Sequence, residues 1–253
     1  MSSGVAFATN TGLVRKRNED SAYVGRWLCA VADGMGGHAA GDVASATVIE
    51  AVRAFDFSVE DPGQLTGVLT RAVRAANDRM AARVRSGRGL EGMGSTLTAL
   101  LWSGDRVAVA NIGDSRGYLL RDGRLRRITE DHVLSKLVAS PMPPEIGEHL
   151  VRFLDARPGW SPDVTLHTAH PGDRYLICSD GLSGVLPPGV IRDVLANAGD
   201  LDEAAETLVD LVHEAGAPDN VTVVAVDVPD GTWAERPGTP VVLGAAAAMA
   251  AVG

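Results

Sequence analysis

Very short turns between strand-like segments are the feature that most restricts how this chain can fold. Ser103-Gly104-Asp105 separates the apolar run 95–102 from 106–112, and Asp122-Gly123 separates 116–121 from 125–129. Such turns join adjacent antiparallel strands, whereas parallel strands need a crossover of roughly a dozen residues. The centre of the chain is therefore predicted to be an antiparallel meander. Further strand-like runs lie at residues 22–32, 164–167, 174–178 and 221–228.

Apolar residues recur at helical spacing in four segments outside this meander. Val43 to Phe55 and Val68 to Val84 precede it, and Val190 to Leu195 and Leu201 to Ala215 follow it. This order of strands, helices, meander, helices and a last strand is not the regular alternation of a doubly wound fold. We expect an α+β fold in which two antiparallel sheets stack face to face with helices outside.

Length and charge limit the class of protein and its partners. The 253 residues, 45% of them hydrophobic, are enough for one large domain with a sizeable core. The balance of 23 basic against 32 acidic residues gives a net charge of −9, which disfavours nucleic acid and anionic membranes as partners. MSSGVAFATN at the start lacks the features of a signal peptide. We expect a cytoplasmic protein that acts as a monomer.

The two cysteines, Cys29 and Cys178, each lie inside an apolar run. We expect both to be buried structural thiols, because a disulfide is unusual in a reducing compartment. Their spacing also excludes a zinc site of the CxxC type.

The end of the chain differs in composition from the rest. PDGTWAERPGTP, residues 229–240, is rich in Pro and Gly and predicts a linker, and the thirteen apolar residues after it are too few to span a bilayer. We therefore expect one domain over residues 1–228, and a linker with an apolar, disordered tail over residues 229–253. A truncated membrane segment is the alternative.

Four aspartates lie where strand-like runs end or begin. Asp33 and Asp180 each follow an apolar run and precede a glycine. Asp114 follows the run 107–112, and Asp219 stands just before the last strand. A single Asp-Gly pair is usually only a turn, but four acids placed in this way indicate a site.

If these strand ends share one edge of the sheets, the carboxylates need a cation, because like charges in a partly desolvated site cannot all ionise. Oxygen ligands without Cys or His at ligand spacing suit Mg²⁺ or Mn²⁺. The glycines after Asp33 and Asp180 would let the backbone turn tightly, so that a carbonyl such as that of Gly34 also faces the ion. Two-metal carboxylate sites commonly serve hydrolysis at phosphorus.

A phosphate substrate also needs a cation from the protein. Arg15 lies just upstream of the acidic pair Glu19-Asp20, and its planar guanidinium suits bidentate phosphate binding. The alternative is that Arg15, Lys16 and Arg17 form a solvated basic turn.

Taken in order, six segments of this sequence resemble the metal-dependent protein phosphatases, the PP2C or PPM family, and most closely its bacterial serine/threonine phosphatases. The matching segments span residues 12 to about 228, nearly the whole predicted domain. They are GLVRKRNED (Gly12 to Asp20), VADGMGGHAAGDVAS (Val31 to Ser45), EGMGSTLTAL (Glu91 to Leu100), IGDSRGYLLRDG (Ile112 to Gly123), YLICSDGLSG (Tyr175 to Gly184) and PDNVTVV (Pro218 to Val224).

The resemblance implies a four-layer αββα sandwich with two catalytic metal ions, Mn²⁺ or Mg²⁺, in a cleft at one end. Asp33 matches the aspartate that bridges both ions, and Gly34 matches the residue that offers its carbonyl oxygen to one of them. Asp180 and Asp219 match the remaining direct carboxylate ligands.

Three further residues match supporting roles in the family. Asp20, beside Glu19, matches an acid that holds metal-bound water. Asp114 matches the residue that, together with the Asp180 equivalent, binds a third, weaker metal ion in bacterial members. Arg15 matches the arginine that binds the substrate phosphate.

Two departures from the family pattern concern proton donation and substrate choice. Met35 stands where animal members have the histidine thought to protonate the leaving group, so the general acid is unassigned and His38 is only a weak candidate. The flap, Asp131 to Pro158, follows the family loosely, and SPMPPEIGEH within it is shorter and more proline-rich than usual.

The resemblance implies hydrolysis of phosphoserine and phosphothreonine in proteins by a metal-bridging water, with phosphorylated proteins, Ser/Thr kinases among them, as partners. One alternative is a dedicated phosphatase of anti-sigma-factor antagonists. Another is a non-catalytic phospho-binding relative, which the presence of Asp33, Asp180 and Asp219 disfavours. A two-metal nuclease is disfavoured by the acidic net charge.

Overall fold

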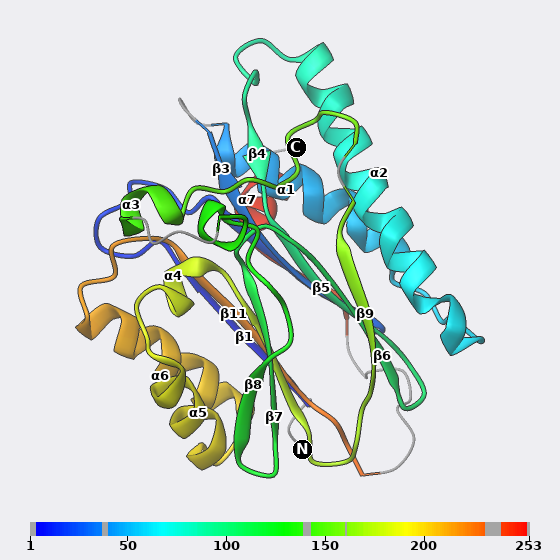
Figure 1. The fold of residues 1–253 in the computed structure, drawn as a ribbon, viewed down its shortest axis with the longest axis vertical. Helices are drawn as coiled ribbons and strands as arrows, with labels where there is room; N and C mark the ends of the chain where they lie inside the picture. Colours follow the sequence, from blue (N-terminus) through cyan, green and yellow to red (C-terminus); the bar gives the residue numbers. More distant parts are fainter. Residues whose placement is uncertain (1–3, 37–39, 139–142, 160, 231–238, 252–253) are drawn as a thin grey trace.

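Two antiparallel β-sheets stacked face to face form the centre of the computed structural model, which describes residues 4–36, 40–138, 143–159, 161–230 and 239–251 (Figure 1). The five-stranded sheet has the order β1 (Val5–Asn10), β11 (Val221–Asp227), β10 (Arg174–Cys178), β7 (Arg116–Arg121) and β8 (Arg124–Arg127). The seven-stranded sheet has the order β12 (Val241–Gly244), β2 (Asp20–Val24), β3 (Leu28–Met35), β5 (Leu97–Ser103), β6 (Arg106–Ile112) and β9 (Asp163–Thr168), with β4 (Gly94–Ser95) paired to β3. The predicted stacked sheets are confirmed.

Helices cover the outer faces of both sheets, as the sequence predicted. The seven-stranded sheet is covered by α1 (Gly41–Val52) and α2 (Leu65–Ser86), and the five-stranded sheet by α4 (Asp180–Ser183), α5 (Pro188–Asn197) and α6 (Leu201–Glu214) (Figure 1). The flap carries η3 (Leu134–Lys136) and α3 (Pro144–Gly147), and η1 (Arg53–Phe55) and η2 (Pro62–Gln64) connect α1 to α2. The predicted αββα layers are therefore confirmed.

Local sequence signals explain how one of these helices begins. Asp200 is the N-cap of α6, and its carboxylate accepts a hydrogen bond from the backbone N–H of Glu203 at 2.9 Å. Such a cap satisfies one of the backbone N–H groups that a helix start leaves unpaired. The apolar side chains of α6 then recur on one face and pack on β1 and β11.

The space between the sheets is filled by large apolar side chains. Trp102 of β5 meets Tyr175 of β10 edge to face, with ring centroids 6.0 Å apart. Both side chains are fully buried, and such a pair contributes about 0.5–1.5 kcal/mol beyond the area that it buries. Cys29 and Cys178 are both buried thiols, as predicted.

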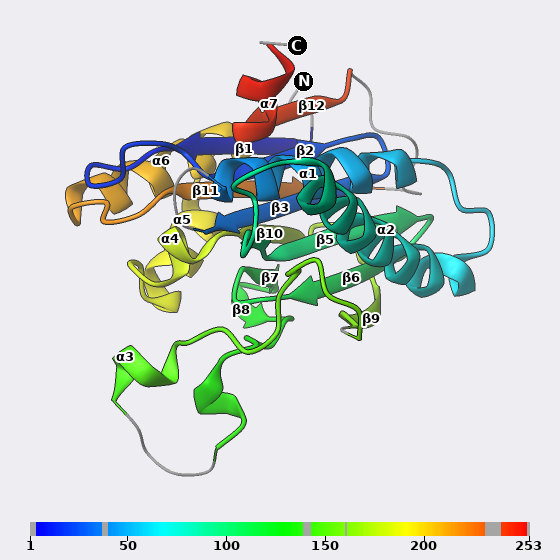
Figure 2. The ribbon, with the colours of Figure 1, turned by 90° about the horizontal axis from the view of Figure 1, so that it is seen from above.

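The end of the chain differs from the prediction. Residues 241–244 form β12, an edge strand paired with β2, and α7 (Ala245–Ala250) packs on α1. Figure 2 shows β12 and α7 on the opposite side of the molecule from α3 and the flap. The ordered fold thus extends past residue 228 and includes a segment expected to be a disordered tail. Most of the predicted linker, residues 231–238, lies outside the described residues.

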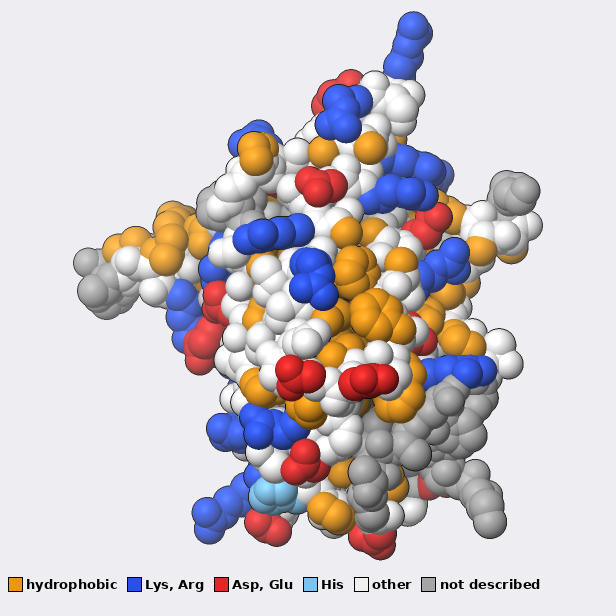
Figure 3. Space-filling model, turned by 90° about the vertical axis from the view of Figure 1, so that its right-hand side faces the viewer, with side chains coloured by type: hydrophobic (Ala, Val, Ile, Leu, Met, Phe, Trp, Pro, Cys, Tyr) orange, Lys and Arg blue, Asp and Glu red, His pale blue; other side chains and the backbone are white. Residues whose placement is uncertain are grey.

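The surface mixes charged and apolar side chains, without one dominant charge on the face that Figure 3 presents. Among the described residues, no helix combines the length and the apolar character that crossing a bilayer requires.

Candidate active site

One pocket of about 240 Å³ brings together most of the residues singled out by the sequence. The strands of the two sheets end or begin around it, which is why acids far apart in the chain meet there. Its predicted members are Arg15, Asp33, Gly34, Asp114, Asp180 and Asp219; its other lining residues are Glu19, Met35, Gly36, Leu150 and Asn220.

Asp20 lies directly beside this pocket. It begins β2 and pairs in register with Asp33 of β3. One of its carboxylate oxygens accepts a hydrogen bond from the Ser179 hydroxyl at 2.7 Å. The other, Oδ1, is buried and has no hydrogen-bond partner in the described part of the chain. A buried unpaired carboxylate oxygen is costly, so this one calls for a cation or a water held by one.

The acids of the pocket perturb one another electrostatically. Burial raises the pKa of Asp33 well above its ordinary value, and the charges of Asp20 and Asp180 raise it further. The pKa of Asp114 is raised to about 7 by burial and by the charge of Asp180. The pKa of Asp20 is also raised to about 7, chiefly by burial. Such a group of acids holds protons at neutral pH unless a cation compensates its charge.

The donor set suits hard divalent cations. Among the described residues, no group of three or more Asp, Glu, His or Cys side chains is arranged to hold a metal by itself. Mg²⁺ needs no such cage, because it keeps several waters and takes only one or two carboxylates from the protein. Asp33, Asp180 and Asp219, with a backbone carbonyl nearby, therefore fit hydrated ions better than a closed structural site.

The two glycines after the acids act differently from the prediction of a tight turn. A Cβ at Gly34 would lie 2.0 Å from the carbonyl oxygen of Gly41, and one at Gly181 would lie 1.8 Å from that of Asn220. Strand β3 continues through Gly34 to Met35. Glycine is required at both positions because another backbone segment approaches closely, and this close packing holds the strand ends together.

Arg15 supplies a positive charge at the mouth of the pocket. Its guanidinium donates a hydrogen bond to the Asp219 carboxylate at 2.6 Å, and its side chain is 54% exposed. The hydrogen bond with Asp219 raises the pKa of Arg15 above its already high value. The guanidinium is therefore charged, directed at the acids and still accessible to a substrate, which disfavours the solvated basic turn.

Asn220 is a positioning residue that sequence reasoning did not assign. Its side-chain oxygen accepts a hydrogen bond from the backbone N–H of Glu19, and its amide group donates to the carbonyls of Thr11 and Arg17. These bonds tie the loop that carries Arg15 to the start of β11. Its place directly after Asp219, before an apolar strand, was the only signal in the sequence.

The position of Met35 is as expected, whereas His38 lies outside the described residues. Met35 ends β3, pairs with Gly94 of β4 and lines the pocket. Leu150 of the flap also lines it. The flap therefore contributes a wall to the same pocket.

Comparison with known proteins assigns the family. The profile of the protein phosphatase 2C family matches residues 16–222 of this chain. The chain belongs to the protein phosphatase 2C family. The predicted family and fold are confirmed.

Bacterial relatives are similar over most of the chain. The serine/threonine protein phosphatase PstP of Mycobacterium tuberculosis is 44% identical over 247 residues, which cover 95% of this chain and 47% of PstP. The serine/threonine phosphatase Stp of Listeria welshimeri is 34% identical, covering 87% of this chain and 94% of the relative. This chain thus spans about half the length of PstP.

A solved structure of such a relative contains metal. The catalytic domain of a PstP phosphatase in complex with two manganese ions has a TM-score of 0.83 and 46% identity to this chain, covering 89% of this chain and 98% of that structure.

Proposed function

We propose that this chain is a metal-dependent protein serine/threonine phosphatase. The observation that carries the proposal is the convergence of Asp33, Asp114, Asp180 and Asp219 with Arg15 on one pocket of about 240 Å³. The relatives named as serine/threonine phosphatases, and the structure with two manganese ions, support it.

The proposed metal ligands combine the residues that line the pocket with the roles that the family resemblance implies. Asp33 would be shared by two ions, with the Gly34 carbonyl, Asp180 and Asp219 completing the contacts from the protein. Asp114 with Asp180 would hold a third, weaker ion, and Asp20 would hold metal-bound water through the oxygen that lacks a partner. We expect Mn²⁺ or Mg²⁺. When bound, such ions polarise phosphoryl oxygens and lower the pKa of a coordinated water.

The chain's own residues orient the substrate. Arg15 is placed to neutralise the non-bridging phosphoryl oxygens, and its planar fork fixes their orientation. Neither buried cysteine can act as a nucleophile, since burial raises the pKa of Cys178 to about 12 and the thiolate is the reactive form. A cysteinyl-phosphate intermediate is therefore excluded, and we expect hydrolysis without a covalent phosphoenzyme. Met35 has no proton to donate, so the leaving alkoxide takes its proton from another group or from water.

The proposed substrates are phosphorylated proteins, including Ser/Thr kinases and the proteins that they phosphorylate. The proposed enzyme acts as a monomer in the cytoplasm and binds neither nucleic acid nor membrane through this chain.

Release of inorganic phosphate from a phosphothreonine peptide tests the proposal. The full chain should release phosphate with Mn²⁺ and lose nearly all of this activity in excess EDTA, and re-added Mn²⁺ should restore it. A chain that binds the peptide but releases no phosphate with Mn²⁺ or Mg²⁺ would instead be a non-catalytic phospho-binding protein.

A further inference from the structure

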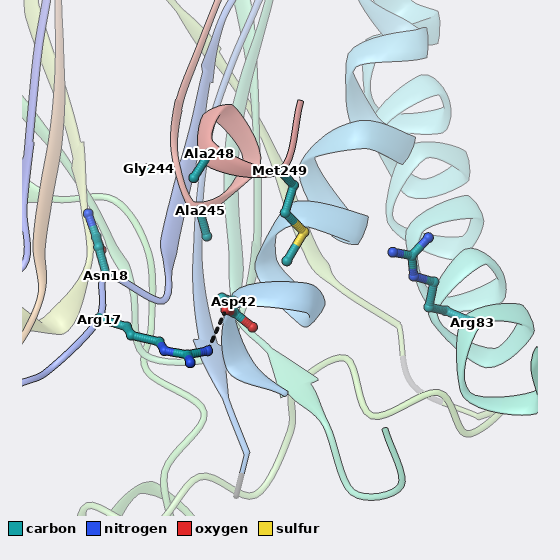
Figure 4. Close-up of a pocket in the computed structure, with 8 residues that line it drawn as sticks. All are labelled: Arg17, Asn18, Asp42, Arg83, Gly244, Ala245, Ala248 and Met249. Carbon is teal, nitrogen blue, oxygen red and sulfur yellow. Dashed lines mark ion pairs between the residues drawn. The ribbon is translucent and has the colours of Figure 1, made fainter. Parts of the chain in front are cut away.

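A second, larger pocket lies beside the proposed catalytic pocket. It has a volume of about 750 Å³, and we call it the lateral groove (Figure 4). It is lined by Arg17, Asn18, Asp42, Arg83, Gly244, Ala245, Ala248 and Met249.

The lateral groove and the catalytic pocket are lined by neighbouring residues of the same loop. Asn18 lines the groove and its neighbour Glu19 lines the catalytic pocket, so one loop forms part of both. On the other side, a Cβ at Gly41 would lie 2.5 Å from a carboxylate oxygen of Glu19, and Asp42 follows Gly41. The groove and the catalytic pocket are therefore separated by little more than Glu19 and the start of α1.

The segment formed by β12 and α7 builds one wall of the lateral groove. Besides the pairing of β12 with β2, the backbone N–H of Ala246 donates to the Ser21 hydroxyl at 3.0 Å. That hydroxyl is 2.9 Å from the hydroxyl of Ser45, which itself donates to the carbonyl of Glu19. The wall is thus anchored to the strand and the loop that carry the catalytic acids.

The lateral groove combines an apolar wall with positive charge. Arg17 and Arg83 lie on opposite sides of Met249 (Figure 4). The Arg17 side chain is 63% exposed. Its Nη1 lies 3.6 Å from the Oδ2 of Asp42, which makes a loose ion pair. Arg83 is exposed and has no ion pair with any described residue. In a chain of net charge −9, the two exposed arginines outnumber Asp42, the one acid that lines the groove, and together with the apolar wall they favour an acidic ligand with some apolar character.

Size points to a polypeptide as this ligand. The catalytic pocket, about 240 Å³, has room for a phosphoryl group and its ions but not for the residues on either side of it. The lateral groove, about 750 Å³, is in the range of ligand-binding pockets, roughly 300–1,000 Å³. A phosphorylated segment that enters the catalytic pocket must place its neighbouring residues on an adjoining surface.

We propose that the lateral groove binds the substrate residues next to the phosphorylated one and selects segments that carry acidic side chains. This inference rests on the proposed phosphatase function. Arg17 and Arg83 attract the acidic side chains, while Ala248 and Met249 contact the apolar parts of the segment. The β12–α7 segment is therefore part of the substrate site.

Two peptides and a small ester distinguish the contribution of the lateral groove to activity from that of the catalytic pocket. One phosphothreonine peptide carries glutamates within three residues of the phosphothreonine, and its partner carries glutamines there. Para-nitrophenyl phosphate, which has no flanking residues, reports on the catalytic pocket alone. We expect the full chain to prefer the glutamate peptide, and we express each result as the ratio of kcat/KM for that peptide to kcat/KM for the ester.

Arg17→Ala and Arg83→Ala should each lower this ratio about threefold, as expected for exposed charge pairs, and the double variant should lower it about tenfold. Arg85→Ala is the matched control, since Arg85 lies in the same last turn of α2 but not in the groove. A fall of the same size in Arg85→Ala, or none in the double variant, would overturn the inference.

Ala248 offers a test of charge that leaves the core intact, because its side chain is exposed on α7. Ala248→Glu should lower the ratio and Ala248→Lys should raise it, each about threefold, and both effects should shrink with added salt. Equal ratios for the two variants would contradict binding of the acidic flanking residues in the lateral groove, but would not affect the proposed phosphatase function. Absence of Mn²⁺-dependent hydrolysis of the ester and of both peptides would refute the phosphatase function itself.

Discussion

Asp33 is the residue at which the conflict between stability and function is greatest. Its side chain is half-buried in the pocket, and this burial and the charges of Asp20 and Asp180 oppose its ionisation. Like charges held together in a desolvated pocket destabilise a fold unless a cation compensates them. The group of acids therefore weakens the metal-free protein, and its benefit lies in binding the cation.

Replacing Asp33 by asparagine should separate these two effects. We expect Asp33→Asn to lower kcat/KM on a phosphothreonine peptide about 10³-fold, equivalent to roughly 4 kcal/mol, because the shared metal ligand is lost. In EDTA at pH 7 the same variant should unfold at higher urea concentration than the parent, because the aspartate must take up a proton to be buried among the other acids and asparagine need not. Asp122→Asn, in an ordinary Asp-Gly turn, is the control. Near-normal turnover by Asp33→Asn would contradict the proposed role of Asp33 as a metal ligand.

Arg15 should matter for substrate more than for metal. Arg15→Ala is expected to raise KM for the phosphopeptide about tenfold or more, since a charge-assisted bond to phosphate contributes about 1.5–3 kcal/mol. Arg15→Lys should recover only part of this loss, because lysine lacks the planar fork. The Mn²⁺ concentration for half-maximal activity should not rise in either variant, because Arg15 competes with a cation for the Asp219 carboxylate. A loss confined to metal affinity would contradict the proposed phosphate contact.

Site residues could be predicted from the sequence where an acidic residue stands directly beside an apolar, strand-like run. Asp33 and Asp180 each follow an apolar run, which was enough to place them at strand ends, and the structure brings the ends of β3 and β10, from different sheets, to one pocket. Asn220 supports the Arg15 loop through hydrogen bonds between segments that are far apart in the chain. Its bond to Glu19, for example, spans 201 positions. No local pattern encodes such a contact.

At the scale of elements, β12 is the strand that most changes the interpretation of the sequence. Gly244 ends it with φ +66°, and a Cβ there would lie 2.1 Å from the carbonyl oxygen of Asp20. Docking of the last strand thus depends on a glycine packed against the backbone of an acid in the active site. The segment is coupled to the site through this contact.

Gly244→Ala should therefore disturb both stability and metal binding. The left-handed backbone and the close contact together should cost about 1–3 kcal/mol of unfolding free energy, measured by urea denaturation. The displaced Asp20 should also raise the Mn²⁺ concentration for half-maximal activity severalfold. Gly104→Ala is the matched control, because Gly104 has φ +57° with nothing within 4 Å of an added Cβ. It should cost stability without altering the Mn²⁺ requirement; equal Mn²⁺ requirements in both variants would exclude the coupling.

Elements joined by short turns were predicted well, whereas those paired at long range were not. The strands β6, β7 and β10 have the predicted bounds, because tight turns and apolar runs define them locally. The predicted strand 22–32 is instead a hairpin of β2 and β3. Strand β1 was not predicted, because no tight turn marks it and it pairs with β11 from the other end of the chain. The same reason explains β12, which pairs with β2.

At the scale of the whole molecule, the buried acids should make stability depend on pH in an unusual direction. Burial raises the pKa of Asp20 and of Asp114 to about 7, whereas an unfolded aspartate titrates near pH 3.9. Between about pH 4 and pH 7 the unfolded chain has released these protons and the folded chain has kept them. The folded state therefore binds more protons, and stability falls as pH rises through this window.

Urea unfolding at pH 5, 6, 7 and 8 tests this dependence. In EDTA the unfolding free energy should decline from pH 5 to 7, and Asp114→Asn should flatten the decline, since a tenfold change in an acid's ionisation constant is worth about 1.4 kcal/mol. Excess Mn²⁺ should stabilise the protein increasingly toward pH 8, because the ion binds the deprotonated acids of the folded state. A metal-free stability that rises from pH 5 to 7, or an Mn²⁺ effect that is the same at every pH, would show that the acids are not buried together as described.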